Sequence, residues 1–174
     1  MPKLIENLRE RLLAETRRTL LEEGPSAVNI RGIAQACGAA TGTVYNYFPS
    51  KEVLIANAIL VDWLEHVDRA CSAIGSCEDV PSGLAAIHRC LVDFVGRYRA
   101  TFAASDYTLA GPTYAERHTM LCDQIAELID GLASRFGLAP SAIAEAVMAE
   151  SLLASVTHDW PADELMSVLE KLIS

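Results

Sequence analysis

The chain has 174 residues and a formal net charge of −9 at pH 7, and apolar residues make up 51% of it. This length allows one domain of ordinary size or a small domain joined to a larger one, and no apolar run is long enough to span a membrane. The charged start, MPKLIENLRERL, lacks the apolar core of a signal peptide, so a cytoplasmic protein is expected. Aromatic residues are few, at 6%, while alanine and leucine are frequent, which favours helices over β-sheets.

Apolar residues recur at helical spacing along the whole chain, and no stretch alternates for long as a strand would. In chain order, the pattern first predicts a helix over about 4–22. A short helix, capped by Ser26 or Asn29, is expected to run to about residue 36, and a second short helix to cover 41–47. A long helix, capped by Ser50, is expected over about 51–74. Glycine, serine and proline predict a connection at 75–83. Further helices are expected from about 84, from about 113 to Gly137, over 141–157 and over 162–173. The expected fold class is all-α, with a three-helix head at residues 1–50 joined by a long helix to a larger helical body at residues 51–174.

The negative charge is unevenly distributed along the chain. Residues 1–51 hold seven Lys or Arg and five Glu, a net charge of +2, whereas residues 52–174 carry a net charge of −11. A mildly basic head on an acidic body is typical of a protein that touches a polyanion with one end only.

The two short helices of the head, joined by Cys37-Gly38-Ala39, have the spacing of a helix-turn-helix unit. A small residue, Ala34, stands where the first helix would touch the second. Gly38 stands where the turn needs a left-handed backbone. The inward positions that are expected to hold the two helices together are apolar: Ile30, Ile33, Cys37, Ala39 and Val44.

The second of these helices is crowded with hydroxyl, amide and phenol groups. Such groups can bond to phosphate oxygens and base edges, Gly42 allows a close backbone approach, and Lys51 and Arg31 can reach phosphates or a guanine. Packing of the head against the long helix is expected for Phe48 and is the alternative role for the tyrosines. The residues expected to contact DNA are Arg31, Thr41, Gly42, Thr43, Tyr45, Asn46, Tyr47 and Lys51.

The stretch IRGIAQACGAATGTVYNYFPSKEVL, residues 30–54, resembles the DNA-binding head of the tetracycline-repressor (TetR) family of bacterial transcriptional regulators. The family pattern is I-A-x-x-A-G-V-S-x-G-T-L-Y-x-Y-F-x-S-K-E-x-L. The resemblance implies a homodimer, a three-helix DNA-binding head whose contacts include the eight residues just named, and a helical body that binds a small-molecule inducer. Two departures are present. Ala39-Ala40 replaces the usual Val-Ser and removes an expected serine cap, and Gly32 stands where an acidic residue is common.

The body is expected to contain an inducer pocket between its long helices and a dimer interface at its last two helices. Pocket candidates combine apolar bulk with polar tips, although aromatic residues at helical spacing also fit a plain core: Trp63, His66, Phe94, Tyr98, Phe102, Tyr107, Tyr114, His118 and Cys122. Small and apolar residues could form a four-helix contact between two chains, or could pack within one chain: Ala142, Ala146, Ala149, Leu153, Val156, Leu165 and Leu169.

No nucleophile elbow, glycine-rich phosphate loop or zinc-ligand spacing is present, and the histidines fall on separate predicted helices. An enzyme is therefore not predicted, and neither is a metal or a cofactor. The five scattered cysteines form no CxxC pair, so reduced and mostly buried thiols are expected, with a thiol redox sensor as the alternative.

The predicted function is that of a ligand-responsive transcriptional regulator, by family default a repressor. It is expected to bind palindromic operator DNA as a homodimer and to be released by a small-molecule inducer. Its expected partners are double-stranded operator DNA, a second copy of the chain and an unidentified inducer, and not a membrane. The alternative is a helical interaction protein that has kept the head but lost specific DNA binding.

Overall fold

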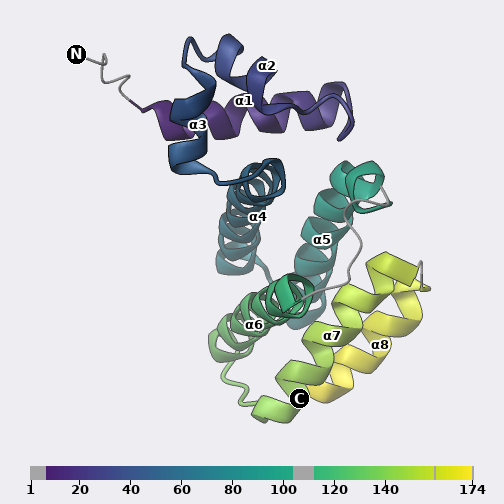
Figure 1. Ribbon diagram of the computed structural model, residues 1–174. Coiled ribbons are helices and arrows are strands. Elements are labelled where there is room, and N and C mark those ends of the chain that lie inside the picture. The colour runs from purple at the N-terminus through teal and green to yellow at the C-terminus, as the bar shows by residue number, and fades with distance from the viewer. Residues whose placement is uncertain (1–6, 104–111, 159, 174) are drawn as a thin grey trace. The chain divides into compact units, whose positions relative to one another are not determined.

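The computed structural model describes residues 7–103, 112–158 and 160–173. Within these ranges the chain forms eight helices and no strand, which confirms the predicted all-α class (Figure 1). The helices are α1 (Leu8–Glu22), α2 (Ile30–Ala36), α3 (Thr41–Tyr47), α4 (Lys51–Ser76), α5 (Val80–Ala103), α6 (Pro112–Arg135), α7 (Ala142–His158) and α8 (Ala162–Ile173). Among the described residues, no helix combines the length and the apolar character that crossing a membrane requires.

The described residues divide into two compact units. The first consists of residues 7–64 together with 97–103, and the second of residues 65–96 together with 112–158 and 160–173. Helices α4 and α5 therefore each contribute residues to both units. The described part of the predicted head belongs to the first unit, and the domain boundary at residue 50 stays a prediction.

The head, formed by α1, α2 and α3, is held together by the apolar positions that the sequence indicates. Helix α2 packs on α3, and the small residue Ala34 is buried. The larger apolar residues of this unit are also buried: Ile30, Ile33, Cys37 and Val44. Helices α2 and α3 have seven residues each, too few to be stable alone in water. Burial contributes about 1.5–3 kcal/mol for each large apolar side chain, and this tertiary packing keeps the two short helices folded.

Helix α2 begins and ends with two specific hydrogen-bonding arrangements. The Asn29 side chain caps its start by accepting a hydrogen bond from the Gly32 N–H at 2.7 Å. At its end Gly38 adopts φ +66°, and the Ala39 N–H donates to the Ala34 carbonyl at 2.8 Å, as in a Schellman motif. A side chain at Gly38 would cost about 1–2 kcal/mol in this left-handed conformation. This turn sets the angle at which α3 leaves α2.

The predicted connection at residues 75–83 is wrong in its extent, because α4 continues to Ser76 and α5 already begins at Val80. Asp79 caps α5 by accepting from the Ser82 N–H at 2.8 Å, and Pro81 lies in the first turn, where no N–H is needed. Gly83 lies inside α5 because a Cβ there would come within 2.2 Å of Leu132 Cδ1 on α6. The residues that suggested a loop are therefore the capped first turn of a helix and a close helix–helix approach.

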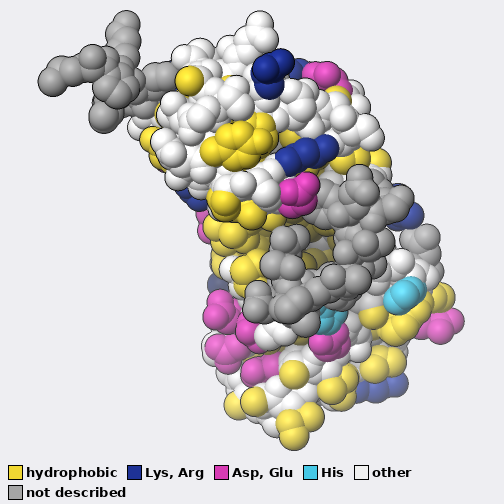
Figure 2. All heavy atoms as spheres, in the orientation of Figure 1, with side chains coloured by type: hydrophobic (Ala, Val, Ile, Leu, Met, Phe, Trp, Pro, Cys, Tyr) yellow, Lys and Arg dark blue, Asp and Glu magenta, His cyan; other side chains and the backbone are white. Residues whose placement is uncertain are grey.

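The second unit is a helical body in which α6 packs on α7 and α7 packs on α8. Its core includes large side chains such as Ile125, Ile129 and Met148, none of them accessible to solvent. Asp123, Glu127 and Asp130 are exposed along α6, and acidic side chains gather over this helix in Figure 2. Part of the excess of acidic residues in the sequence thus lies on a solvated helix face.

Candidate nucleic-acid interface

Helix α3 presents a polar and aromatic face to solvent. Val44 is completely buried, whereas the neighbouring Tyr45 and Tyr47 are 51% and 46% exposed. Gly42 and Asn46 are also exposed. Helix α3 is thus anchored by one side while its opposite side remains accessible.

The ends of α3 match two expectations from the sequence. Ala40 is its N-cap residue and contributes no side-chain hydrogen bond, as expected from the replaced serine. Phe48 follows the helix and is buried, and the Arg9 guanidinium lies over its ring at 5.6 Å from the centroid. Phe48 therefore packs inside the head, and Thr41 and Thr43 remain partly exposed on α3.

Two arginines of α1 are engaged within the first unit. Arg9 donates to Asn57 Oδ1 at 3.1 Å, in addition to its contact with Phe48. Arg11 donates to the carbonyl of Cys37 at 3.0 Å and so satisfies the end of α2. Both positive charges serve the packing of the head.

A buried carboxylate on α4 holds another arginine. Asp62 is completely buried, with Oδ1 2.6 Å from Arg17 Nη2 and 3.8 Å from Arg97 Nη1. Burial first, and then the negative charge of Asp62, raise the pKa of the Tyr98 phenol. This group ties α1 to α4 and α5 within the first unit.

Arg18 lies in an exposed cluster on α1. It pairs with Glu15, Glu22 and Glu23, and the hydrogen bonds that it donates to Glu15 and Glu22 raise the pKa of its guanidinium. Among the described basic residues of positions 7–51, Arg31 and Lys51 form neither an ion pair nor a hydrogen bond through their side chains, whereas Arg9, Arg11, Arg17 and Arg18 do. Arg31 is exposed on α2 and Lys51 is partly exposed in the first turn of α4. The positive charges of these two residues are therefore not taken up by ion pairs within the chain.

Residues 12–58 match the family model described as bacterial regulatory proteins, tetR family. The N-terminal part of the chain thus matches the DNA-binding region of the tetR family. The match runs from α1 through α2 and α3 into α4, which is the part of the chain that carries the exposed helix and its supporting contacts. No curated protein matches the sequence.

Solved structures share the fold of this chain over nearly its whole length. RolR in complex with resorcinol is 19% identical over 97% of this chain and 88% of its own, with a TM-score of 0.69. FadR from Bacillus subtilis in complex with stearoyl-CoA is 18% identical over 95% of this chain and 97% of its own, with a TM-score of 0.59. A TetR-family transcriptional regulator from Streptomyces coelicolor is 19% identical over 97% of each chain, with a TM-score of 0.56.

Most of the predicted inducer-pocket residues lie in the cores of the two units. Trp63 and Tyr98 are buried in the first unit, and His66 and Phe94 are buried in the second, with their rings edge-on at 5.4 Å. Phe102 is 38% exposed. Tyr107 and the side chain of Tyr114 lie outside the described residues, and His118 and Cys122 lie together on α6.

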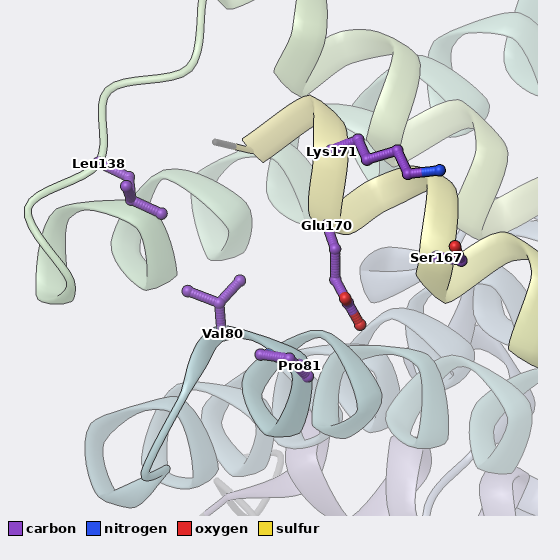
Figure 3. A pocket seen from close by; sticks show the side chains of 6 residues that line it. All are labelled: Val80, Pro81, Leu138, Ser167, Glu170 and Lys171. Carbon is purple, nitrogen blue, oxygen red and sulfur yellow. The ribbon is translucent and has the colours of Figure 1, made fainter.

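Two surface grooves lie in the described part of the second unit, and no predicted pocket residue lines either of them. The first has a volume of about 540 Å³ and lies between the start of α5, the residues after α6, and α8. Figure 3 shows Glu170 pointing into this space toward Pro81, while Lys171 points away from it. The second, of about 470 Å³, runs along α7. Its lining residues are Ala142, Ile143, Ala146, Val147, Glu150 and Ser151.

The predicted interface residues divide into two groups. Ala142 and Ala146 are exposed and line the groove along α7. The others are buried within the single chain: Ala149, Leu153, Val156, Leu165 and Leu169. The sequence prediction did not include Ile143, Val147 and Val168, which are 78%, 48% and 53% exposed on α7 and α8. Helical spacing of small and apolar residues predicted both the exposed and the buried group. Spacing alone does not tell which side of α7 packs against the rest of the chain.

Three of the cysteines have an environment opposite to that of a reactive thiol. Burial raises the pKa of Cys37 and of Cys90. Burial, followed by the charge of Glu150, raises the pKa of Cys122 to about 12. These thiols are protonated at neutral pH, whereas a redox sensor needs an accessible thiolate.

Proposed function

We propose that this chain is a ligand-responsive transcriptional repressor that acts in the cytoplasm, binds palindromic operator DNA as a homodimer, and leaves it when a small molecule binds. The observation that supports this most directly is the exposed face of α3. Its tyrosines stand half exposed on a helix whose opposite side is anchored by Val44. The Tyr47 ring contacts that of Phe48, with 6.4 Å between the centroids, but packing leaves about half of each tyrosine uncovered. DNA offers phosphates and base edges to such exposed groups.

The side chains of the head then divide by role. Thr43, Tyr45 and Asn46 are proposed to reach base edges, while Arg31 and Lys51 are proposed to hold phosphates and so fix the position of α3 on the duplex. Because the four described arginines of α1 are engaged internally, the number of phosphate contacts per head is small. The salt dependence of binding should therefore be modest for a protein of this size.

The proposed dimer is supported by apolar side chains that the single chain leaves uncovered. Ile143, Val147 and Val168 form exposed apolar positions on α7 and α8, next to the small residues Ala142 and Ala146. A second copy of the chain would bury them, and a two-fold dimer would read two half-sites. Sedimentation velocity is expected to give a dimer at micromolar concentration, and Ile143→Lys is expected to shift it toward the monomer. A strict monomer for the unaltered chain would contradict the dimer.

The inducer is proposed to be a largely apolar small molecule held in the helical body. RolR was solved with resorcinol and FadR with stearoyl-CoA, two ligands with substantial apolar parts. Helix α4 begins at Lys51 and contributes to both units, so a ligand-dependent shift of α4 would move the residues that hold DNA. A differential free energy of about 1.4 kcal/mol changes DNA affinity tenfold, so a small shift suffices.

The test is fluorescence anisotropy with the DNA upstream of the protein's own gene, across a salt series. Lys51→Ala removes one phosphate contact from each half-site, and the slope of log affinity against log salt should become shallower by about 2. Lys171→Ala removes the same charge from α8 and serves as the control, with no expected change in slope. Tyr45→Ala should weaken binding by about 1–3 kcal/mol per half-site.

Two outcomes would contradict the proposal. If neither this DNA nor a duplex selected from a random pool binds specifically, the head acts as a scaffold and the chain is a helical interaction protein. If Lys51→Ala and Lys171→Ala change the slope equally, the contact face lies elsewhere. A verified ligand that leaves DNA affinity unchanged at saturation would refute the inducer mechanism alone.

A further inference from the structure

We propose that His118, Cys122 and Glu150 form a Zn²⁺ site that links α6 to α7. Their ligand atoms, an imidazole nitrogen, a sulfur and a carboxylate oxygen, all lie within 4.8 Å of one another. The proposal goes beyond the proposed function, because it depends neither on DNA binding nor on an organic inducer.

The helical repeat brings the first two ligands together. His118 and Cys122 are four residues apart on α6, so they lie on one face, one turn apart. The His118 Nε2 atom lies 3.7 Å from Cys122 Sγ. This is close to the spacing of about 3.6 Å that tetrahedral Zn²⁺ imposes on a nitrogen and a sulfur ligand.

The third ligand comes from the neighbouring helix. Glu150 on α7 places Oε2 at 2.9 Å and Oε1 at 3.1 Å from His118 Nε2. Tetrahedral Zn²⁺ would separate nitrogen and oxygen ligands by about 3.3 Å, so His118 and Glu150 already lie within a few tenths of an ångström of ligand spacing. Because α6 and α7 pack against each other in the second unit, the three groups stay together without a loop to hold them.

Burial changes in steps across the three ligands. Cys122 is buried, with 8% of its surface accessible, whereas the side chains of His118 and Glu150 are 35% and 56% exposed. The site therefore has a buried thiol at its base and a carboxylate at its solvent side, which gives an ion a route of entry. The fourth position of the tetrahedron would be filled by water or by another ligand.

The donor set selects among metals. Mg²⁺ and Ca²⁺ prefer oxygen ligands, while an imidazole together with a thiolate suits a borderline-soft ion such as Zn²⁺. Binding replaces the thiol proton by the metal, and the two positive charges of the ion compensate the thiolate and the Glu150 carboxylate. Without a metal, the same side chains would form a surface ion pair beside a core cysteine, and such exposed pairs contribute little to stability.

The experiment uses the full-length, tag-free chain, treated with a chelator and kept reduced, with Co²⁺ as a spectroscopic probe for the Zn²⁺ site. The expected result is one Co²⁺ per chain, with a thiolate-to-cobalt charge-transfer band and the strong visible bands of a tetrahedral site. One equivalent of Zn²⁺ should remove both sets of bands and raise the thermal midpoint. Absence of saturable one-to-one binding would overturn the proposal.

Matched variants identify the ligands. Cys122→Ser should abolish the charge-transfer band, and Glu150→Gln should lower the affinity by at least about 100-fold, since even indirect partners of a metal site cost 10–100-fold. Cys71→Ser, at an exposed cysteine, and Glu145→Gln, on the same helix as Glu150, should leave the spectrum and the affinity unchanged.

A band that persists in Cys122→Ser, or that disappears in Cys71→Ser, would show binding elsewhere and refute the site. Glu150→Gln alters a mostly exposed side chain, so it remains decisive if Cys122→Ser folds poorly. Equal loss of affinity in Glu150→Gln and Glu145→Gln would also refute the assignment.

Discussion

The buried pair between Arg17 and Asp62 predicts that losing the more exposed partner destabilises the chain more than losing the buried one. Arg17 Nη2 lies 2.6 Å from Asp62 Oδ1, and the two side chains are 27% and 0% exposed. Without the charge of Asp62, the Arg17 guanidinium can still reach water. Without Arg17, the carboxylate of Asp62 stays buried, and the guanidinium of Arg97, at 3.8 Å, is a weaker replacement.

The expected magnitudes follow from this asymmetry. Arg17→Met keeps the apolar stem of the side chain and removes its charge. It should lower the free energy of unfolding by about 3 kcal/mol. This is the low end of the range for a broken buried ion pair, because Arg97 still lies near the carboxylate of Asp62. Asp62→Asn should cost about 1 kcal/mol. The double variant Arg17→Met/Asp62→Leu replaces the pair by apolar groups and should return to within about 1 kcal/mol of the unaltered chain.

Urea denaturation followed by far-ultraviolet circular dichroism measures these differences, at one fixed chain concentration because association would shift the apparent stability. Arg18→Met is the control on the same helix, since the partners of Arg18 lie at the surface, and it should barely move the midpoint. If Asp62→Asn costs as much as Arg17→Met, or if Arg18→Met costs as much as either, burial does not control the strength of this pair.

Three further predictions concern single side chains. An added Cβ at Gly42 meets no atom within 4 Å, so Gly42→Ala should raise the free energy of unfolding by about 0.5–1 kcal/mol while weakening DNA binding in anisotropy; equal DNA affinity would remove Gly42 from the contact face. Gly83→Ala should cost about 1–3 kcal/mol in urea denaturation, because its Cβ would lie 2.2 Å from Cδ1 of the buried Leu132, and an unchanged midpoint would mean that Leu132 can move aside. Burial lowers the pKa of His88, so below about pH 6.5 the unfolded chain binds more protons than the folded one, and stability falls as the pH falls toward the lowered pKa. His88→Gln should flatten this dependence of the denaturation midpoint on pH, and an unchanged profile would show that other groups cause it.

Helix positions were predictable where local chemistry decides them. The bounds of α3 at 41–47 and of α8 at 162–173 agree with the prediction, because Gly38 and Phe48-Pro49 delimit the first and Pro161 precedes the second. The connection predicted at 75–83 is longer than the observed one, and the reason lies in the packing of one helix on another. Gly83 signals a loop in the sequence, but it is required inside a helix by Leu132, a residue far along the chain.

The exposed face of α3 was also determined by the sequence, since the 3.6-residue repeat puts Val44 on one side and the polar residues on the other. The roles of the arginines were decided only by the tertiary structure. Arg9, Arg11 and Arg17 count equally as positive charges in the sequence, yet each is held by a group on another element of the first unit.

The same division applies to the proposed metal site. The spacing of His118 and Cys122 is visible in the sequence, while Glu150 joins them only through the packing of α6 on α7. Hydrogen bonds between near neighbours set the spacing of side chains within a helix. Which helix faces meet depends on burial of apolar surface contributed by the whole chain, and for this reason partners across helices became known only from the folded structure.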